Sequence, residues 1–139
     1  MKFNYLTTSG VFDTRGKAVK RPMLELELFC GNKTLNAFGH IDSGADTTTL
    51  NIQYAEALGI KIDHTKKREI LGIGNGRVTA FVSNLQFKIK GSDLVVEVPA
   101  WFVDSENVNI LLGQEVFFDR FKIKFEKEQG TFELVEVKK

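Results

Sequence analysis

The sequence predicts a mostly-β single domain that is built from many short strands and carries one or two short helices. The length of 139 residues suits one domain. Hydrophobic residues make up 42% of the chain and include twelve Phe, which is enough apolar material for a buried core. In several stretches apolar and polar residues alternate one by one, which is the pattern of a strand with one buried face.

The first predicted strand pair begins near residue 24. Its first strand alternates leucine with glutamate, in the order Leu24, Glu25, Leu26, Glu27 and Leu28. Residues 31–33, Gly-Asn-Lys, provide a turn, and residues 34–41 form the returning strand. The pattern therefore predicts a hairpin that leads directly into Asp42.

Two further strand pairs are predicted in the second half of the chain. Residues 85–89 and 94–98 are rich in apolar side chains and flank a Gly-Ser-Asp turn at 91–93. The last pair turns at 128–130, and its apolar positions are Phe121, Ile123, Phe125, Phe132, Leu134 and Val137. Each pair predicts an antiparallel hairpin.

Two short helices are predicted between the strands. One covers residues 51–58, with Asn51 as its N-cap and Gly59 as its terminator. The other makes about one turn over residues 114–118. Residues 1–20 have the least regular pattern, and we predict that they form an arm, an extra strand or a removable leader before a domain at 21–139.

Charge and cysteine content exclude several kinds of partner and site. Nineteen basic residues nearly balance eighteen acidic ones, so there is no electrostatic reason to expect nucleic acid or a membrane surface as a partner. No apolar run approaches the ~20 residues of a membrane-spanning helix. Cys30 is the single cysteine, which excludes an intrachain disulfide and favours a cytoplasmic location. His40 and His64 lie far apart in the sequence, so no metal site is expected.

Asp42-Ser43-Gly44 is the segment with the clearest chemical potential. A carboxylate that follows an apolar strand and precedes a glycine suits a tight loop, because glycine adopts backbone angles that other residues resist. Taken alone, the tripeptide also fits an ordinary turn that begins with Asp. A nucleophilic role for Ser43 is not expected, since no nucleophile-elbow motif surrounds it.

Residues 38–50, which read FGHIDSGADTTTL, resemble the active-site loop of retropepsins and their cellular and bacterial relatives. Residues 110–113, Ile-Leu-Leu-Gly, are similar to the family's apolar-apolar-Gly element, which runs beside that loop and precedes a short helix. Between them, the glycine-rich residues 71–76 look like the tip of the family's flap hairpin. Three elements in this order imply the closed β-barrel of a single-domain acid protease over residues 21–139.

The resemblance implies an aspartic endopeptidase that acts as a homodimer on a peptide or protein substrate. Pepsin-like relatives carry two such loops in a chain more than twice as long, whereas this chain carries one. Two copies of Asp42 would therefore meet at a two-fold axis, share one proton and activate a water between them. This chemistry needs no metal and no organic cofactor.

The same resemblance assigns roles to the residues around Asp42. Ser43 would hydrogen-bond across the two-fold axis, and Gly44 would donate its amide to the carboxylate and leave room for substrate. Ala45 and Leu111 would line the substrate site. Because some relatives have Ser in place of Ala45, the alanine implies activity that extends closer to neutral pH.

Two further groups of residues receive roles by resemblance. Gly72, Ile73 and Gly74 would lie at the flap tip and cover bound peptide. Arg21, which precedes a proline as in retroviral enzymes, would pair with Asp46 of the partner across the dimer.

The chain departs from the retroviral pattern at two places. Gln114 follows the apolar-apolar-Gly element where retroviral enzymes have Arg, and residues 121–137 form a full hairpin, as in bacterial and cellular relatives. The alternative to an enzyme is a catalytically silent member of the same fold that dimerises or binds extended peptide. A β-barrel adaptor in which Asp42 lies in a coincidental turn is a further alternative, which the three ordered motifs disfavour.

Overall fold

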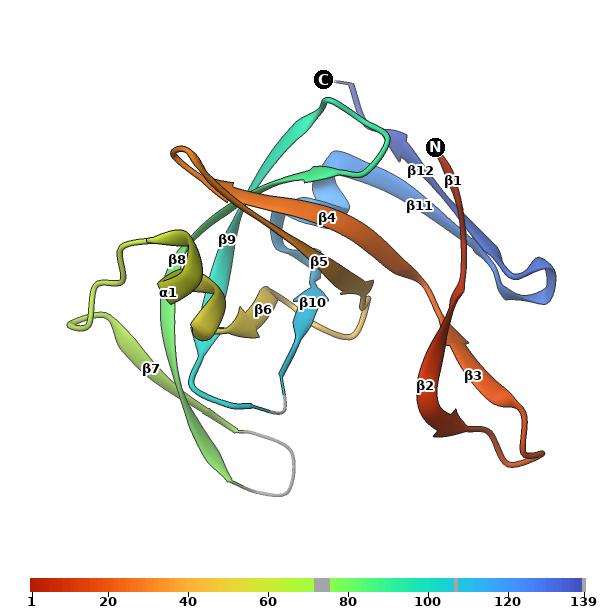
Figure 1. The fold of residues 1–139 in the computed structure, drawn as a ribbon, viewed down its shortest axis with the longest axis horizontal. Helices are drawn as coiled ribbons and strands as arrows, with labels where there is room; N and C mark the ends of the chain where they lie inside the picture. Colours follow the sequence, from red (N-terminus) through yellow and green to blue (C-terminus); the bar gives the residue numbers. More distant parts are fainter. Residues whose placement is uncertain (72–75, 107, 139) are drawn as a thin grey trace.

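The computed structural model describes residues 1–71, 76–106 and 108–138, and strands dominate them (Figure 1). The elements in chain order are β1 (Lys2–Asn4), β2 (Leu6–Phe12), β3 (Ala18–Arg21), β4 (Met23–Cys30), β5 (Lys33–Ile41), β6 (Thr48–Asn51), α1 (Gln53–Leu58), β7 (Lys67–Leu71), β8 (Arg77–Ile89), β9 (Val95–Val103), β10 (Ile110–Leu112), η1 (Gln114–Phe118), β11 (Phe121–Glu126), η2 (Lys127–Gln129) and β12 (Thr131–Glu136).

The central sheet closes on itself. Its strands follow the order β4-β5-β10-β6-β9-β8, and β4 also pairs with β8, so the sheet forms a closed barrel (Figure 1). β7 extends the sheet by pairing with β8 in antiparallel fashion. The predicted fold class, a mostly-β closed barrel with short helices, is confirmed.

The leucines whose alternation predicted the first strand lie in the core. Leu24, Leu26 and Leu28 are buried, and the β4–β5 hairpin runs in register from the Met23–His40 pair to the Cys30–Lys33 pair. The predicted β8–β9 hairpin also forms, and it is longer at its open end than the sequence pattern indicates. The bulkiest buried side chains are Phe87, Phe102, Phe117, Phe121 and Phe132.

The C-terminal hairpin β11–β12 gains a third strand from the other end of the chain. β1 pairs with β12, and the Phe3 ring stacks on Phe132 with ring centroids 5.4 Å apart. The resulting sheet has the order β1-β12-β11. The prediction that Val137 belongs to the last strand is wrong by one residue, because β12 ends at Glu136; the Val137 amide donates to the Arg120 carbonyl, directly after the Phe121–Glu136 pair.

The segment between β1 and the barrel forms a separate hairpin. β2 and β3 pair only with each other among the described strands, and Figure 1 shows this two-stranded ribbon extending away from the barrel. Residues 1–21 thus contain three strands, the first in the C-terminal sheet and the other two in a projecting ribbon.

Both predicted helical segments are present, but the start of the first and the regularity of the second differ from the prediction. α1 begins at Gln53 with Ile52 in the N-cap position, so Asn51 is not the N-cap, although its side-chain oxygen accepts the Gln53 amide at 2.9 Å. Gly59 ends α1 in the left-handed conformation at φ 72, as predicted. At η1 the regular turn is interrupted, because Glu115 and Val116 leave helical angles. No helix in the described part of the chain is long and apolar enough to cross a membrane.

Candidate active site

The loop that carries Asp42 is fixed by a strand from far along the chain. β10 lies between β5 and β6, parallel to β5 and antiparallel to β6. Its Leu112 is the register partner of Ile41, and the Leu112 carbonyl accepts the amide of Asp42 at 3.0 Å. Asp42 therefore leaves the barrel at a defined point, where β5 ends.

The Asp42 carboxylate is held by its own loop. The Gly44 amide donates to Oδ1 of Asp42 at 2.9 Å, and the Ala45 amide donates to the Asp42 carbonyl at 3.2 Å. A side chain at position 44 would lie 3.2 Å from Oδ1, so glycine leaves this side of the carboxylate open. Asp42 itself is partly exposed, which keeps the carboxylate accessible from outside the chain.

Gly113 permits the closest approach at the site. A Cβ added to it would lie 2.4 Å from the backbone of Thr47, a separation that no side chain can occupy. The Gly113 amide donates to the hydroxyl of Thr48 at 3.2 Å, and Thr48 is fully buried. The apolar-apolar-Gly element thus packs directly against the end of the Asp42 loop.

Gln114 and Glu115 connect the segment after β10 to the Asp42 loop through three hydrogen bonds. The side-chain amide of Gln114 donates to the Ser43 carbonyl at 2.6 Å, and its backbone amide donates to the Ala45 carbonyl at 2.8 Å. The Glu115 amide donates to the carbonyl of Asp46 at 2.8 Å. The first amides of a helix have no partner within it, so these bonds tie the start of η1 to the Asp42 loop.

Sequence reasoning identified Gln114 only as a departure from the retroviral pattern and missed its contact with the loop. The available signal was its position, since an amide side chain directly after Gly113 can reach a neighbouring backbone carbonyl. Thr48 was missed as well, because its role depends on a contact with a residue 65 positions away.

His40 lies two positions before Asp42, and both the Asp42 carboxylate and the Arg21 guanidinium are near its side chain. Burial lowers the pKa of His40 below its usual value, the nearby Asp42 carboxylate opposes that shift, and the Arg21 guanidinium adds to it. The root of the β2–β3 hairpin is therefore near the Asp42 loop. A backbone bond confirms this, since the Ile41 amide donates to the Pro22 carbonyl at 3.0 Å.

One row of cross-strand neighbours crosses the barrel beside Asp42. The row consists of Met23, His40, Leu111, Thr49, Trp101 and Val82. Direct neighbours on adjacent strands share a face of the sheet. All six are at least partly exposed, whereas Leu24, Ile110, Leu50 and Phe102, which lie in the row next to it, are buried. The row thus provides an outward-facing surface that begins next to the carboxylate.

Of the residues in this row, only Leu111 was predicted as a site residue. The other residues of the row were not predicted, because the residues that lie side by side depend on strand register. The register of β10 and β6 is set by tertiary packing. The predicted flap residues Gly72, Ile73 and Gly74 lie outside the described residues. β7 and β8 pair up to Leu71 and Arg77 on either side of them.

The predicted contact between Arg21 and Asp46 does not form within one chain. Arg21 ends β3, Asp46 is exposed in the Asp42 loop, and the ion pairs within residues 1–71, 76–106 and 108–138 include neither side chain. Across that same part of the chain, no three His, Cys, Asp or Glu side chains gather as a metal site.

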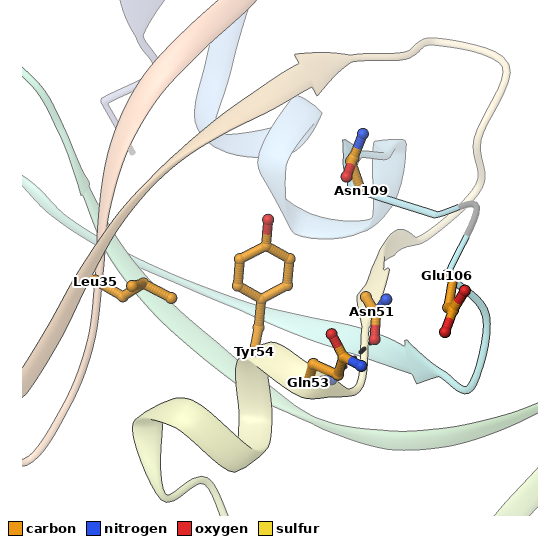
Figure 2. Close-up of a pocket in the computed structure, with 6 residues that line it drawn as sticks. All are labelled: Leu35, Asn51, Gln53, Tyr54, Glu106 and Asn109. Atoms are coloured by element: carbon orange, nitrogen blue, oxygen red, sulfur yellow. Dashed lines mark hydrogen bonds between the residues drawn. The ribbon is translucent and has the colours of Figure 1, made fainter.

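A cavity of about 510 Å³ lies apart from the predicted site residues (Figure 2). Its lining consists of Leu35, Asn51, Gln53, Tyr54, Glu106 and Asn109. Asn51 is already engaged, because its side-chain amide donates to the Ser105 carbonyl at 3.0 Å and its oxygen accepts the Gln53 amide. None of the lining residues belongs to the Asp42 loop, so the Asp42 carboxylate and this cavity are separate features.

Comparison with known proteins places this geometry in a family. The family described as "gag-polyprotein putative aspartyl protease" matches residues 30–119, which include both the Asp42 loop and β10. Comparison with curated proteins gives no significant match.

Solved structures share the fold at low sequence identity. The retroviral protease-like domain of Ddi1 from Leishmania major is 13% identical, with a TM-score of 0.56 over 83% of this chain and 90% of that one. A retropepsin-like aspartic protease from Rickettsia conorii is 17% identical, with a TM-score of 0.55 over 97% of this chain and 98% of that one. The EIAV protease in complex with the inhibitor HBY-793 is 24% identical, with a TM-score of 0.50 over 78% and 93%.

The family match covers well over half of the chain, and the similar structures share its barrel over most of their length. The chain therefore belongs to the gag-polyprotein aspartyl protease family and has the fold of the retropepsin-like aspartic proteases.

Proposed function

We propose that this chain is an aspartic endopeptidase that acts as a homodimer, with one Asp42 from each subunit. The observation that carries the proposal is the Asp42 carboxylate itself. It is partly exposed at the end of β5, on a loop that β10 and Gln114 fix from the other side. A carboxylate positioned in this way suits proton transfer to and from a bound water.

The proposed mechanism requires two carboxylates close together. Two like charges at that distance do not ionise together readily, so the pair holds a single proton, and aspartic proteases are the usual example of this effect. The ionised carboxylate takes a proton from the water that attacks the scissile carbonyl. The protonated carboxylate donates a hydrogen bond to the carbonyl oxygen. Ser43, by hydrogen-bonding to the partner's loop, keeps the two acids in plane.

The substrate in this proposal is an extended peptide that lies along the exposed row beside Asp42. Leu111 lies in that row, and Ala45 is partly exposed in the loop. Gly72, Ile73 and Gly74 close over the peptide, and Arg21 pairs with the partner's Asp46. We also propose a cytoplasmic location, where the single Cys30 thiol stays reduced.

Cleavage of a peptide library, followed by mass spectrometry, tests the proposal. We expect wild type to cleave and to bind a pepstatin-type transition-state mimic. Asp42→Asn removes the titrating group and is expected to lower kcat/KM by at least about a hundredfold. Asp93→Asn is the matched control, because Asp93 is an exposed carboxylate in the turn between β8 and β9.

Two results would contradict the proposal. A dimer that binds peptides but does not cut them would favour the catalytically silent module. A monomer that cuts peptides would refute the shared dyad. The pH–rate profile tests the role of Ala45, since we expect activity to extend toward neutral pH, and a profile confined below about pH 4 would count against that expectation.

A further inference from the structure

The β2–β3 hairpin has no further strand beside it in the described part of the chain. Among the described strands β2 and β3 pair only with each other, and an isolated two-stranded ribbon is at best marginally stable in water. Most of its residues are exposed, and Phe12 at the end of β2 is 66% exposed. A ribbon of this kind is expected to gain stability when a further surface covers it.

The root of the hairpin is close to the reactive carboxylate. Leu6 and Arg21 are register partners at its base, and Pro22 accepts the amide of Ile41, the residue before Asp42. If two copies of Asp42 share a proton, the second subunit must approach this same end of the barrel. The root of the hairpin then lies close to the subunit interface.

Apolar surface continues from the hairpin onto the barrel. A groove of about 480 Å³ lies between β2 and the outer face of β4 and β5, and its lining includes Leu6, Met23 and Phe38. Leu6 is 36% exposed and Phe38 is 47% exposed. Burial of such side chains against another subunit is favourable at roughly 25 cal/mol per Å² of apolar surface.

The terminal sheet is less suited to this role. β1 and β12 already pair within one chain, so the terminal strands do not require a partner subunit to complete their sheet. Its one large, well-exposed aromatic side chain in the described residues is Phe125, which is 41% exposed. The unpaired ribbon near Asp42 is the better candidate for an intersubunit contact.

We propose that the β2–β3 hairpin is a dimerisation arm that packs on a second copy of this chain, with Phe12 as its main apolar contact. The arm deepens the proposed function, on which it rests, by naming the element that brings the two Asp42 loops together. By two-fold symmetry each subunit provides one arm and receives one.

Sedimentation velocity over a dilution series tests the arm. Phe12→Ser is expected to raise the dimer dissociation constant at least about tenfold, as is typical for the loss of a central aromatic contact. Phe38→Ser, in the adjoining groove, is expected to weaken the dimer less. Phe125→Ser is the matched control, an exposed Phe near the end of a strand in the other hairpin, and is expected to dimerise as wild type does.

A labelling experiment gives a second readout that does not depend on stability. In a Cys30→Ser background, a thiol introduced by Phe12→Cys is expected to react with a maleimide faster as the protein is diluted and the dimer dissociates. A thiol introduced by Phe125→Cys is expected to react at the same rate at every concentration.

The possible outcomes test the dimerisation arm and the proposed peptidase activity separately. A wild-type dimer that is unaffected by Phe12→Ser, or is weakened by Phe125→Ser instead, overturns the arm alone. A dimer that depends on Phe12 but does not cut peptides supports the arm and contradicts the peptidase. A wild type that stays monomeric at every concentration overturns both.

Discussion

The hairpins β2–β3 and β11–β12 are similar in local architecture and different in what covers them. Each pairs two antiparallel strands, and each turns at a glycine with positive φ, Gly16 at 77 and Gly130 at 70. The C-terminal hairpin buries Phe121, Phe132 and Leu134 in the core, whereas the N-terminal hairpin leaves Phe12 largely exposed.

The difference shows that local pairing is enough to form a hairpin but does not decide which other elements cover it. β11–β12 receives a third strand, β1, and packs its inner face on the barrel. β2–β3 receives no strand from the described part of the chain. The β11–β12 hairpin is therefore expected to unfold together with the domain. The β2–β3 hairpin is expected to open on its own.

The largest difference in the free energy of unfolding is expected when one aromatic ring is removed from each hairpin. Phe132 is buried and packs on Phe3 and Tyr5, so Phe132→Ala should lower the free energy of unfolding by about 3–5 kcal/mol. Phe12→Ala removes an exposed ring, and in the monomer it should change that free energy by less than about 0.5 kcal/mol. Urea unfolding at low protein concentration measures both. Equal losses would show that β2–β3 is part of the cooperative core.

A smaller effect is expected at the two turns. Alanine at Gly130 or Gly16 must adopt positive φ, which costs roughly 1–2 kcal/mol, and neither Cβ meets another atom within 4 Å. Gly130→Ala should reduce global stability by that amount. Gly16→Ala should chiefly accelerate amide hydrogen exchange at Thr7 and Lys20 while global stability changes little. Exchange that is slow and equal in both hairpins would contradict local opening.

A pH effect is expected at the root of the N-terminal hairpin. Burial lowers the pKa of His40, with Arg21 adding to the shift and Asp42 opposing it. The unfolded chain therefore binds this proton more readily, so stability should fall as the pH drops through the usual histidine range and below it. His40→Gln should flatten that dependence in urea unfolding at several pH values. His64→Gln is the control, and an unchanged pH profile in His40→Gln would remove His40 as the cause.

The smallest effect is expected at the tip of the N-terminal hairpin. The amides of Lys17 and Arg15 donate to the Asp13 carboxylate and hold its pKa below the usual value. The contacts contribute above the usual Asp pKa and are lost as the pH falls through the lowered pKa. In an NMR titration, the Arg15 and Lys17 amide signals should shift with Asp13 and stop shifting in Asp13→Asn. The amide of Gly59, at the end of α1, should not follow that titration.

The local elements followed from the sequence because their signals are local. Leucines at every second position predicted β4, and Gly59 predicted the end of α1. The Asp42 loop was located from Asp-Ser-Gly and its flanking strand. Two local predictions were wrong: Ile52 takes the N-cap position of α1 in place of Asn51, and Glu115 and Val116 leave helical angles within the turn predicted over residues 114–118.

The sequence by itself determined the strands with clear alternation, such as β4 and β11, which loop holds the acid and that each chain carries one such loop, because these depend on near neighbours. Only the tertiary structure decided that β10 lies beside Asp42, that Gln114 holds Ser43, and that the exposed row includes Trp101. Those contacts join residues 50 or more positions apart. Their geometry depends on how the whole sheet closes, which no local pattern specifies.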